Sequence, residues 1–357
     1  MRKIFVIKIG TQVITRDNGS LDLRVMKRIA GDIRNVRELG YDVILVSSGA
    51  VGAGKGIINQ PRMKDTLTKK QIFASVGQVE LMRSYTKFFD KYGIRTAQVL
   101  VTKEDFRDRH HYLNMNNCFN GLLGERIVPI VNENDVVAIT ELVFTDNDEL
   151  AGLVSAMVNA KKLLILTSVP GVFISNKDGS RKIIDTVRLD DISKLEKYIS
   201  SEKTSSGRGG MRTKISIAKK AASHGIETVI ACGRDKGVIS ACARGEDVGT
   251  RFVAKKGITA VKRRIAYSEG LSKGIVHVNK SAEEVLSSQN AASLLPVGVT
   301  KIDGDFKKGD VVEIWNRKNN KIGFGLAWCD SDKARESIGM KKKKPVIHYD
   351  HMFIEAK

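Results

Sequence analysis

The sequence predicts an α/β protein with a mostly parallel central sheet, followed by a smaller C-terminal β domain. Up to about residue 255, apolar strand-like runs alternate with amphipathic segments, the pattern of a parallel sheet covered by helices. After about residue 260, short strand-like runs separated by turn residues replace that pattern. The length of 357 residues also exceeds the rough allowance of about 150 residues for one domain. We expect domains over 1–256 and 273–357, joined by a linker over 257–272.

Six apolar runs are expected to form the strands of the first domain. They lie at 4–9, 43–47, 97–101, 127–131, 163–167 and 228–231. Between the first two runs, the apolar residues of 23–36 recur at helical spacing, and Gly40 stands where a helix commonly ends. This succession of strand, helix and strand indicates a βαβ unit, the building block of a parallel sheet.

The second domain is expected to consist of short strands joined by tight turns. Strand-like runs occur at 274–278, 311–315 and 323–328, and turn residues occur at 303–305, 308–310 and 319–320. The segment 255–269 is rich in Lys and Arg and lies where the two patterns meet. We therefore expect it to belong to the connection between the domains.

The formal net charge of +20 raises the question of a nucleic-acid partner. Residues 258–357 hold 18 basic and 12 acidic side chains, a net charge of +6, and the other 257 residues carry +14. The positive charge is thus spread over both domains. The densest run, four lysines at 341–344, is more typical of a solvated loop than of a specific phosphate contact. An enzyme with anionic substrates accounts for the charge equally well.

The sequence favours a cytoplasmic protein without a membrane span. The cysteines Cys118, Cys232, Cys242 and Cys329 are widely separated and show no metal-ligand spacing, so neither a disulfide framework nor a zinc site is indicated. The N-terminus enters a strand without a signal-peptide core. No window approaches the roughly 18 apolar residues that a membrane-spanning helix needs.

A charged residue interrupts the first predicted strand. Lys8 follows the apolar residues 4–7 and precedes Ile9, Gly10 and Thr11. A buried, unpaired charge costs several kcal/mol, so Lys8 should have an anionic partner. Open α/β sheets bind ligands at the carboxyl ends of their strands, which suggests that the partner is a phosphate. A lysine that extends to solvent at a sheet edge is the alternative.

Three polar clusters follow predicted strands or begin predicted helices. The turn 47–50 offers two hydroxyls and exposed N–H groups at a helix start, which suits an anion. Four polar side chains at 132–135 follow directly after the strand 127–131, as expected for recognition of a small polar molecule. The cluster 145–148 precedes an apolar helix, so we expect capping to occupy one of its two aspartates, leaving a carboxylate to order nearby lysines.

A fourth cluster is the glycine-rich, basic loop 205–214, which leads into an amphipathic helix that ends at Gly225. Backbone N–H groups, the helix dipole and Lys214 can converge there on a triphosphate. The Walker and dinucleotide-binding patterns are absent from the sequence. Two lysines from separate loops suit phosphoryl transfer, because its transition state spreads charge over the phosphoryl oxygens.

Together these motifs resemble the glutamate 5-kinase family, which has the amino acid kinase fold and a C-terminal PUA domain. The matching segments are 8–11, 47–50, 131–135, 146–148 and 209–214, with 293–310 resembling the PUA domain. The resemblance implies a three-layer sandwich with a mostly parallel central sheet, and a small β-barrel-like PUA domain. It also implies ATP-dependent phosphorylation of the side-chain carboxylate of L-glutamate, the first step of proline biosynthesis.

The resemblance also assigns roles to individual residues. Lys8 and Lys214 would steady the transferring phosphoryl group, and Asp148 would hold the two lysines in place. The implied substrate-binding residues are Ser48, Asp135 and Asn147, with Asn132, Asn134, Gly49 and Ala50 beside them. The implied ATP-binding residues are Lys8, Gly10, Thr167, Ser168, Arg208, Gly209, Gly210, Met211, Arg212, Thr213 and Lys214. Mg²⁺ would be carried by the ATP phosphates, with no metal site in the protein.

The chain departs from the family pattern at two of these positions. Ser168 stands where many members have Asp near the nucleotide base, and Arg208 replaces a smaller residue of the glycine loop. The resemblance further implies L-proline as a feedback inhibitor and glutamate-5-semialdehyde dehydrogenase as a functional partner. It implies a homo-oligomer, a dimer or a tetramer, and RNA as a ligand that a PUA domain can bind.

Two other functions stay open on the residues alone. Another kinase of the same fold would use the same lysines on aspartate, N-acetylglutamate, carbamate or a nucleoside monophosphate. An RNA-binding protein on a degenerate kinase scaffold would explain the +20 charge and the lysine run 341–344. The intact set of Lys8, Lys214 and Asp148 argues against the second.

Overall fold

The computed structural model describes residues 2–58, 62, 65–137, 144, 146–175, 180–188, 210–256, 259, 265, 272–288, 292–341 and 343–354. The chain divides into two compact units. Unit 1 comprises Met1–Lys103 and Asn116–Gly257, and unit 2 comprises Glu104–Met115 and Ile258–Lys357. Most of the expected linker 257–272 lies outside the described residues. No helix in the described ranges is long and apolar enough to cross a membrane.

Unit 1 is built on an eight-stranded sheet with the order β3-β4-β2-β1-β5-β9-β10-β8. Its strands are β1 (Lys3–Ile9), β2 (Tyr41–Ser47), β3 (Thr96–Val101), β4 (Val128–Glu133), β5 (Lys162–Thr167), β8 (Thr186–Val187), β9 (Glu227–Cys232) and β10 (Thr250–Phe252). The pairings from β3 to β9 are all parallel, and β10 pairs antiparallel with β9. All six strands expected from the sequence are present, and the prediction of a mostly parallel sheet is confirmed.

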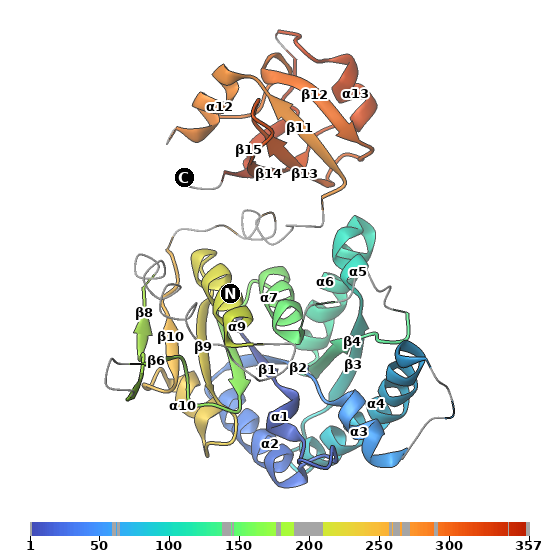
Figure 1. Ribbon diagram of the computed structural model, residues 1–357, viewed down its shortest axis with the longest axis vertical. Helices are drawn as coiled ribbons and strands as arrows, with labels where there is room; N and C mark the ends of the chain where they lie inside the picture. Colours follow the sequence, from blue (N-terminus) through green and yellow to red (C-terminus); the bar gives the residue numbers. More distant parts are fainter. Residues whose placement is uncertain are drawn as a thin grey trace. The chain divides into compact units, whose positions relative to one another are not determined.

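Helices cover both faces of this sheet (Figure 1). The described helices of unit 1 are α1 (Thr11–Ile14), α2 (Leu23–Glu38), α3 (Ala50–Ile57), α4 (Thr66–Asp90), α7 (Asn147–Met157), α9 (Met211–Ser223) and α10 (Val238–Arg244). The helix α5 (Lys103–Arg107) belongs almost entirely to unit 2, and α6 (Arg109–Gly124) is divided between the two units. A small separate hairpin joins β6 (Phe173–Ser175) to β7 (Arg181–Ile183). The predicted helix over 23–36 is α2, and Gly40 follows its end with φ +81°.

The alternation of β1 decides which face each of its side chains meets. Phe5, Ile7 and Ile9 are buried in the core that the sheet shares with α2, α4 and α10. Side chains alternate along a strand, so Lys8 points to the opposite face, where α7 packs on β1 and β5. The sequence pattern and the layer order together therefore direct this lysine toward α7.

Unit 2 contains a five-stranded sheet with the order β12-β11-β13-β14-β15. Its strands are β11 (Gly274–Val278), β12 (Val299–Gly304), β13 (Val311–Trp315), β14 (Lys321–Ala327) and β15 (Ile347–Ile354). Two helices, α12 (Lys280–Ser287) and α13 (Ser331–Glu336), and the short 3-10 helix η3 (Pro296–Gly298) accompany it. Its own apolar core includes Val276, Val312 and Ile314. The expected small β domain is thus confirmed.

Candidate active site

Two lysines meet two aspartates at the end of β1. Lys8 Nζ lies 2.6 Å from Asp148 Oδ1, and Lys214 Nζ lies 2.8 Å from Asp148 Oδ2. Asp146 adds a second, longer pair of contacts, 3.4 Å to Lys8 Nζ and 3.6 Å to Lys214 Nζ. The four charges come from β1, from the start of α7 and from the first turn of α9, which lies beside α7 (Figure 1). We call this set the charged cluster.

Three of the four residues of the charged cluster are taken almost completely out of water. Lys8 is 2% exposed, Asp148 is 0% exposed and Lys214 is 8% exposed. Burial by itself would raise the pKa of Asp148, but the ammonium groups of Lys8 and Lys214 outweigh it and hold that pKa below its usual range. Asp148 is therefore a carboxylate at neutral pH, and its two oxygens hold the two cations side by side.

The expectation that helix capping occupies one of the two aspartates was wrong. Asp146 stands at the N-cap position of α7, yet its carboxylate makes no capping hydrogen bond within the described structure. Both of its oxygens instead face lysine ammonium groups. Two cations in a poorly solvated site attract a carboxylate more strongly than a backbone N–H does, because charge-assisted contacts are the stronger ones.

Gly10 leaves room for the Lys8 ammonium group. A Cβ atom at Gly10 would lie 3.8 Å from Lys8 Nζ and 3.2 Å from the carbonyl oxygen of Leu166. The Gly10 N–H donates to that same carbonyl, which fixes the chain as it leaves β1. Any larger side chain at Gly10 would therefore begin directly beside the Lys8 ammonium group. This supports Gly10 as a residue that lines the charged cluster.

A second set of polar side chains, all uncharged, lies next to the charged cluster in the sequence and in space. Asn147, between the two aspartates, donates through Nδ2 to Ser48 Oγ and to Asn132 Oδ1, both at 2.9 Å. Asn132 Nδ2 in turn donates to Gln78 Oε1, also at 2.9 Å. We call Ser48, Gln78, Asn132 and Asn147 the amide network. It joins the ends of β2 and β4 to α4 and α7.

The strand β4 ends two residues later than expected, so the first two residues of the polar segment belong to it. Asn132 and Glu133 are still strand residues and pair in register with Leu100 and Val101 of β3, whereas 134–135 follow the strand. Strand pairing thus tolerates these polar residues at the sheet's carboxyl edge. Glu133 is half-buried and accepts the N–H of Phe144 at 3.0 Å, and burial raises the pKa of its carboxyl.

Asp135 is close to the same region but is engaged by a cation of α4. Its Oδ1 lies 2.7 Å from Lys70 Nζ, and the carbonyl of the next residue, Val136, accepts from Gln71 Nε2. Asn134 lies in the same turn, where its N–H donates to Val101. The structure thus brings Asn132 and Asp135 against one wall, formed by α4.

The helix α4 can form this wall because it lies very close to α3 (Figure 1). A Cβ atom at Gly77 would lie 1.8 Å from the carbonyl oxygen of Ala50, so only glycine allows this approach. At the other side of the turn, Gly49 has φ +107° and starts α3. Gly49 and Ala50, at the start of α3, are therefore held against Gly77, the residue that precedes Gln78 in α4.

The residues expected to bind the nucleotide are only partly described. Thr167 ends β5, and Ser168, the residue after it, donates from Oγ to Gln12 Oε1 at 2.9 Å. Gly210 is the N-cap of α9, and Met211, Arg212 and Thr213 form its first turn together with Lys214. Arg208 and Gly209 lie outside the described residues. The start of α9 presents a helix N-terminus directly beside the charged cluster.

Sequence reasoning missed four residues that the structure brings to this region. Gln78, Lys70 and Gln12 contact predicted site residues, and Asp146 completes the charged cluster. Asp146 had a visible signal, because it shares the motif 145–148 with Asp148. Gln78 and Lys70 sit on a long amphipathic helix more than 50 residues before their partners, and nothing in the local pattern marks them.

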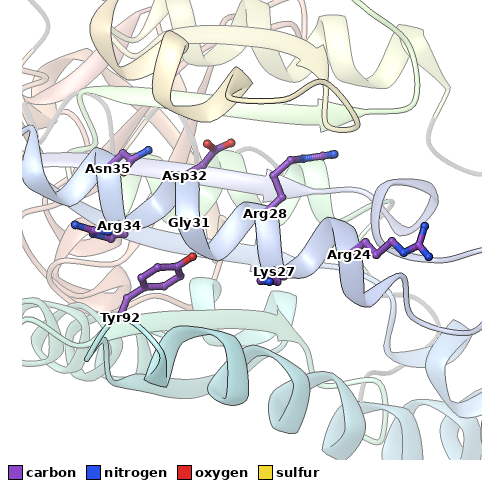
Figure 2. Close-up of a pocket in the computed structure, with 8 residues that line it drawn as sticks. All are labelled: Arg24, Lys27, Arg28, Gly31, Asp32, Arg34, Asn35 and Tyr92. Atoms are coloured by element: carbon purple, nitrogen blue, oxygen red, sulfur yellow. The ribbon is translucent and has the colours of Figure 1, made fainter.

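A separate surface pocket lies along α2 and is lined by none of the predicted site residues (Figure 2). It has a volume of about 460 Å³, and its lining comprises Arg24, Lys27, Arg28, Gly31, Asp32, Arg34, Asn35 and Tyr92. Two of its cations already have partners. Arg28 donates to the carbonyl of Gly233 at 3.1 Å, and Arg34 pairs with Glu38 at 2.9 Å.

Known protein families match residues in both units of the chain. Residues 3–232 match the model of the amino acid kinase family, and residues 274–349 match that of the PUA domain. A curated protein of Chlorobaculum tepidum named glutamate 5-kinase is 46% identical over 351 residues, which cover 98% of this chain and 96% of the relative. This chain belongs to the glutamate 5-kinase family. The family resemblance drawn from the motifs is thereby confirmed.

Other glutamate 5-kinases match along the same length. The one from Bacteroides thetaiotaomicron is 42% identical over 353 residues and 98% of each chain is covered. Among solved structures, carbamate kinase from Giardia lamblia bound to AMP-PNP matches with a TM-score of 0.53 and 18% identity. That match covers 71% of this chain and 99% of the neighbour, and it supports the amino acid kinase fold.

Proposed function

We propose that this chain transfers the γ-phosphoryl group of ATP to the side-chain carboxylate of L-glutamate, the first step of proline biosynthesis. The observation that carries the proposal is the charged cluster: two buried lysines, held 2.6 and 2.8 Å from one carboxylate, at the carboxyl end of a parallel sheet. Full-length similarity to proteins named glutamate 5-kinase supports the choice of substrate.

The reaction needs no general base. A side-chain carboxylate oxygen of glutamate attacks the γ-phosphorus of ATP, and the bond from that phosphorus to the β,γ-bridging oxygen breaks. ADP departs with the electron pair, and the product is the mixed anhydride L-glutamyl 5-phosphate. The attacking carboxylate is already ionised at neutral pH, so no proton has to be removed. Catalysis then depends on position and on stabilisation of charge.

Lys8 and Lys214 would supply that stabilisation. The transition state spreads negative charge over the phosphoryl oxygens, and two ammonium groups in a poorly solvated site act on it more strongly than they would in water. Asp148 holds both ammonium groups in place before the substrates arrive, so little reorganisation is required. We propose Lys8 and Lys214 as catalytic residues and Asp148 as the positioning residue between them.

The amide network is proposed to bind the amino-acid end of glutamate. Asn147 uses both hydrogens of its Nδ2 on Ser48 and Asn132, which leaves its oxygen to accept from an ammonium group. Asp135 offers a carboxylate for the same cation. Because Asn147 lies between Asp146 and Asp148, one short segment connects recognition of the substrate with the phosphoryl site.

ATP is proposed to bind through the start of α9 and the end of β5. The N-terminus of α9 favours an anion, and Gly210, Met211, Arg212 and Thr213 precede Lys214 there. Thr167, the last residue of β5, and Ser168, the residue after it, are proposed to face the base. Both carboxylates of the charged cluster are already paired with lysines, which fits Mg²⁺ that arrives bound to the ATP phosphates.

An ATP-dependent hydroxamate assay tests the proposal. Hydroxylamine traps an acyl phosphate formed from L-glutamate, L-aspartate or N-acetyl-L-glutamate, supplied one at a time. We expect product from L-glutamate alone. Product from another acid would keep the fold and the mechanism but replace the substrate, as for another kinase of this fold. No product from any acid, despite ATP binding, would contradict the proposed reaction.

One observation favours RNA as an additional ligand of unit 2. Trp328 and His348 are stacked with ring centroids 5.4 Å apart, His351 and Tyr349 lie against them, and Lys308 Nζ is 5.6 Å from the Trp328 ring. Aromatic rings beside a cation can stack unpaired bases. Salt-dependent binding of single-stranded RNA that Trp328→Ala abolishes would support this function, and unchanged binding would remove it.

We further propose the biological setting that the family implies. An acyl phosphate is labile, so an enzyme that reduces it, glutamate-5-semialdehyde dehydrogenase, is the proposed functional partner. L-Proline is the proposed feedback inhibitor, and a dimer or tetramer the proposed assembly. A cytoplasmic location is supported by four cysteines that are all free thiols.

A further inference from the structure

One donor of the amide network has no acceptor. Gln78 is 8% exposed, and its Nε2 is buried and has no hydrogen-bond partner among the described residues. Buried polar atoms in folded proteins are paired in the great majority of cases, so an unpaired one needs an explanation. The other polar atom of the same side chain, Oε1, does have a partner, Asn132 Nδ2 at 2.9 Å.

The orientation of the Gln78 amide follows from its neighbours. The backbone N–H of Glu133 can only donate, and it donates to Asn132 Oδ1 at 2.9 Å. Asn132 must therefore donate to Gln78 through Nδ2, and Gln78 must accept through Oε1. A flipped amide would place two N–H groups against each other. The atom left without a partner is thus Nε2, a donor of two hydrogens.

The unpaired donor belongs to the wall that faces the proposed glutamate site. Asn132 lies between Gln78 and Asn147 and forms a hydrogen bond of 2.9 Å with each of them. The close approach of Gly77 to Ala50 fixes Gln78 beside the start of α3, where Ser48 and Gly49 lie. Neighbouring Lys70 is paired with Asp135 at 2.7 Å, so the protein itself already compensates its charge.

The charges of glutamate determine what this donor can meet. The side-chain carboxylate has to lie at the charged cluster, where phosphoryl transfer takes place. The ammonium group has acceptors in Asn147 Oδ1 and Asp135. The α-carboxylate is the remaining group, and it needs donors on the amide side, because Asp146 and Asp148 would repel it on the other side.

We infer that Gln78 is a specificity residue, whose Nε2 donates a hydrogen bond to the α-carboxylate of the substrate. The inference rests on the proposed function and names a contact of the same site. A buried donor that has no partner within the described protein discriminates strongly, because any substrate without the matching acceptor leaves it unpaired. Gln78 thus selects α-amino acids over acids that have the same chain and no α-carboxylate.

The test compares three substrates that differ by one group. L-Glutamate has both groups, 4-aminobutyrate lacks the α-carboxylate, and glutarate lacks the ammonium group. For each, kcat/KM is measured as ATP-dependent ADP release. In Gln78→Met we expect the preference for L-glutamate over 4-aminobutyrate to fall by about 10- to 100-fold, the usual effect of one hydrogen bond to a charged group. The preference over glutarate should change less than about 3-fold.

Two further variants control for indirect effects. Gln78→Glu keeps an acceptor for Asn132 but places a carboxyl where the donor was, so it should lower kcat/KM for L-glutamate far more than for 4-aminobutyrate. This result holds even if Gln78→Met fails to fold. Gln71→Met makes the same change on the same helix, where Nε2 donates to Val136, and both preferences should stay as in the wild type.

Equal loss of both preferences in Gln78→Met, or no loss of either, would overturn the inference and leave Gln78 a structural residue. A loss in Gln71→Met as large as in Gln78→Met would do the same. The proposed function fails in a different way, because wild-type protein would then release no ADP with L-glutamate at all.

Discussion

The two ends of the candidate site differ in the charge of the side chains that form them. At the charged cluster, Lys8, Lys214, Asp146 and Asp148 bring two positive and two negative charges into a buried space. At the amide network, neutral side chains join one another by hydrogen bonds of 2.9 Å. Under the proposed function, the charges stabilise a transition state in which charge moves, and the neutral donors and acceptors recognise the end of the substrate that stays unchanged.

The two ends also differ in the direction in which the pKa of a carboxyl group is shifted. The lysines lower the pKa of Asp148 in spite of its burial, and burial raises the pKa of Glu133, beside the amide network. Removal of water raises the pKa of both carboxyls, but the net shifts are opposite, because Asp148 faces two ammonium groups whereas Glu133 accepts a backbone N–H from Phe144. The two lysine ammonium groups thus decide the direction of the pKa shift at Asp148, and burial decides it at Glu133.

Removal of a lysine from the charged cluster should give the largest effect. We expect Lys8→Ala and Lys214→Ala each to lower kcat by about 100- to 1,000-fold, by analogy with loss of one oxyanion-hole donor. Steady-state ADP release with L-glutamate measures it. Lys162→Ala is the matched control, because Lys162 is also buried in the sheet but donates to the carbonyl of Cys242. Near-wild-type kcat in Lys8→Ala would remove the assigned role.

Removal of an amide should act on binding instead. Asn147→Ala takes away the donor to Ser48 and Asn132 and the proposed acceptor for the substrate ammonium group. We expect KM for L-glutamate to rise by about 10- to 100-fold, with a smaller change in kcat. The same kinetic measurement tests it. A fall in kcat as large as for Lys8→Ala would mean that the two ends do not act separately.

A change in the helix pair behind the amide network should cost stability. Gly77→Ala places a methyl group 1.8 Å from the Ala50 carbonyl oxygen, so α3 and α4 must move apart. We expect a loss of about 1–3 kcal/mol in the free energy of unfolding, measured by urea denaturation. Gly121→Ala on α6 meets nothing within 4 Å and is the control. Equal stability of both variants would show that the close approach is not required.

The smallest effects are expected from the pH dependence of the unfolding free energy, which for Asp148 should be flat in the neutral range. The lowered pKa of Asp148 contributes stability that is complete above its unfolded-state pKa of about 3.9 and is lost as pH falls through the lower folded value. The difference in unfolding free energy between wild type and Asp148→Asn should therefore stay constant from about pH 8 to 5 and shrink below about pH 4.

The pH dependence of Glu133 should have the opposite sign. Because its folded pKa is raised, Glu133 penalises the folded state once the pH exceeds its unfolded-state value of about 4.3. Glu133→Gln should thus gain stability relative to wild type as pH rises from about 4 toward neutrality, in urea titrations. A gain with falling pH would contradict the assignment of burial as the dominant cause.

Much of the fold could be predicted because its pattern is local. The six apolar runs, the spacing of 23–36 and the turn signals after 260 needed nothing beyond neighbouring residues, and the elements formed where expected. The short strands β8 and β10 were missed, since runs of two and three residues carry no usable period. In unit 2, the strands β12 and β15 were not expected either, and β12 includes two residues of the expected turn 303–305. The expected cap at Asp146 failed because a local rule could not include the two distant lysines.

By itself the sequence determined the strand order along the chain, the position of Lys8 at a strand end and the presence of Asp148 and Lys214 in recognisable motifs. Only the tertiary structure decided that both aspartates pair with both lysines, and that Gln78 of α4 completes the amide network. The reason is physical, because these contacts join residues that are 54 to 140 positions apart in the sequence. Packing of strands and helices sets such distances, and no local pattern encodes them.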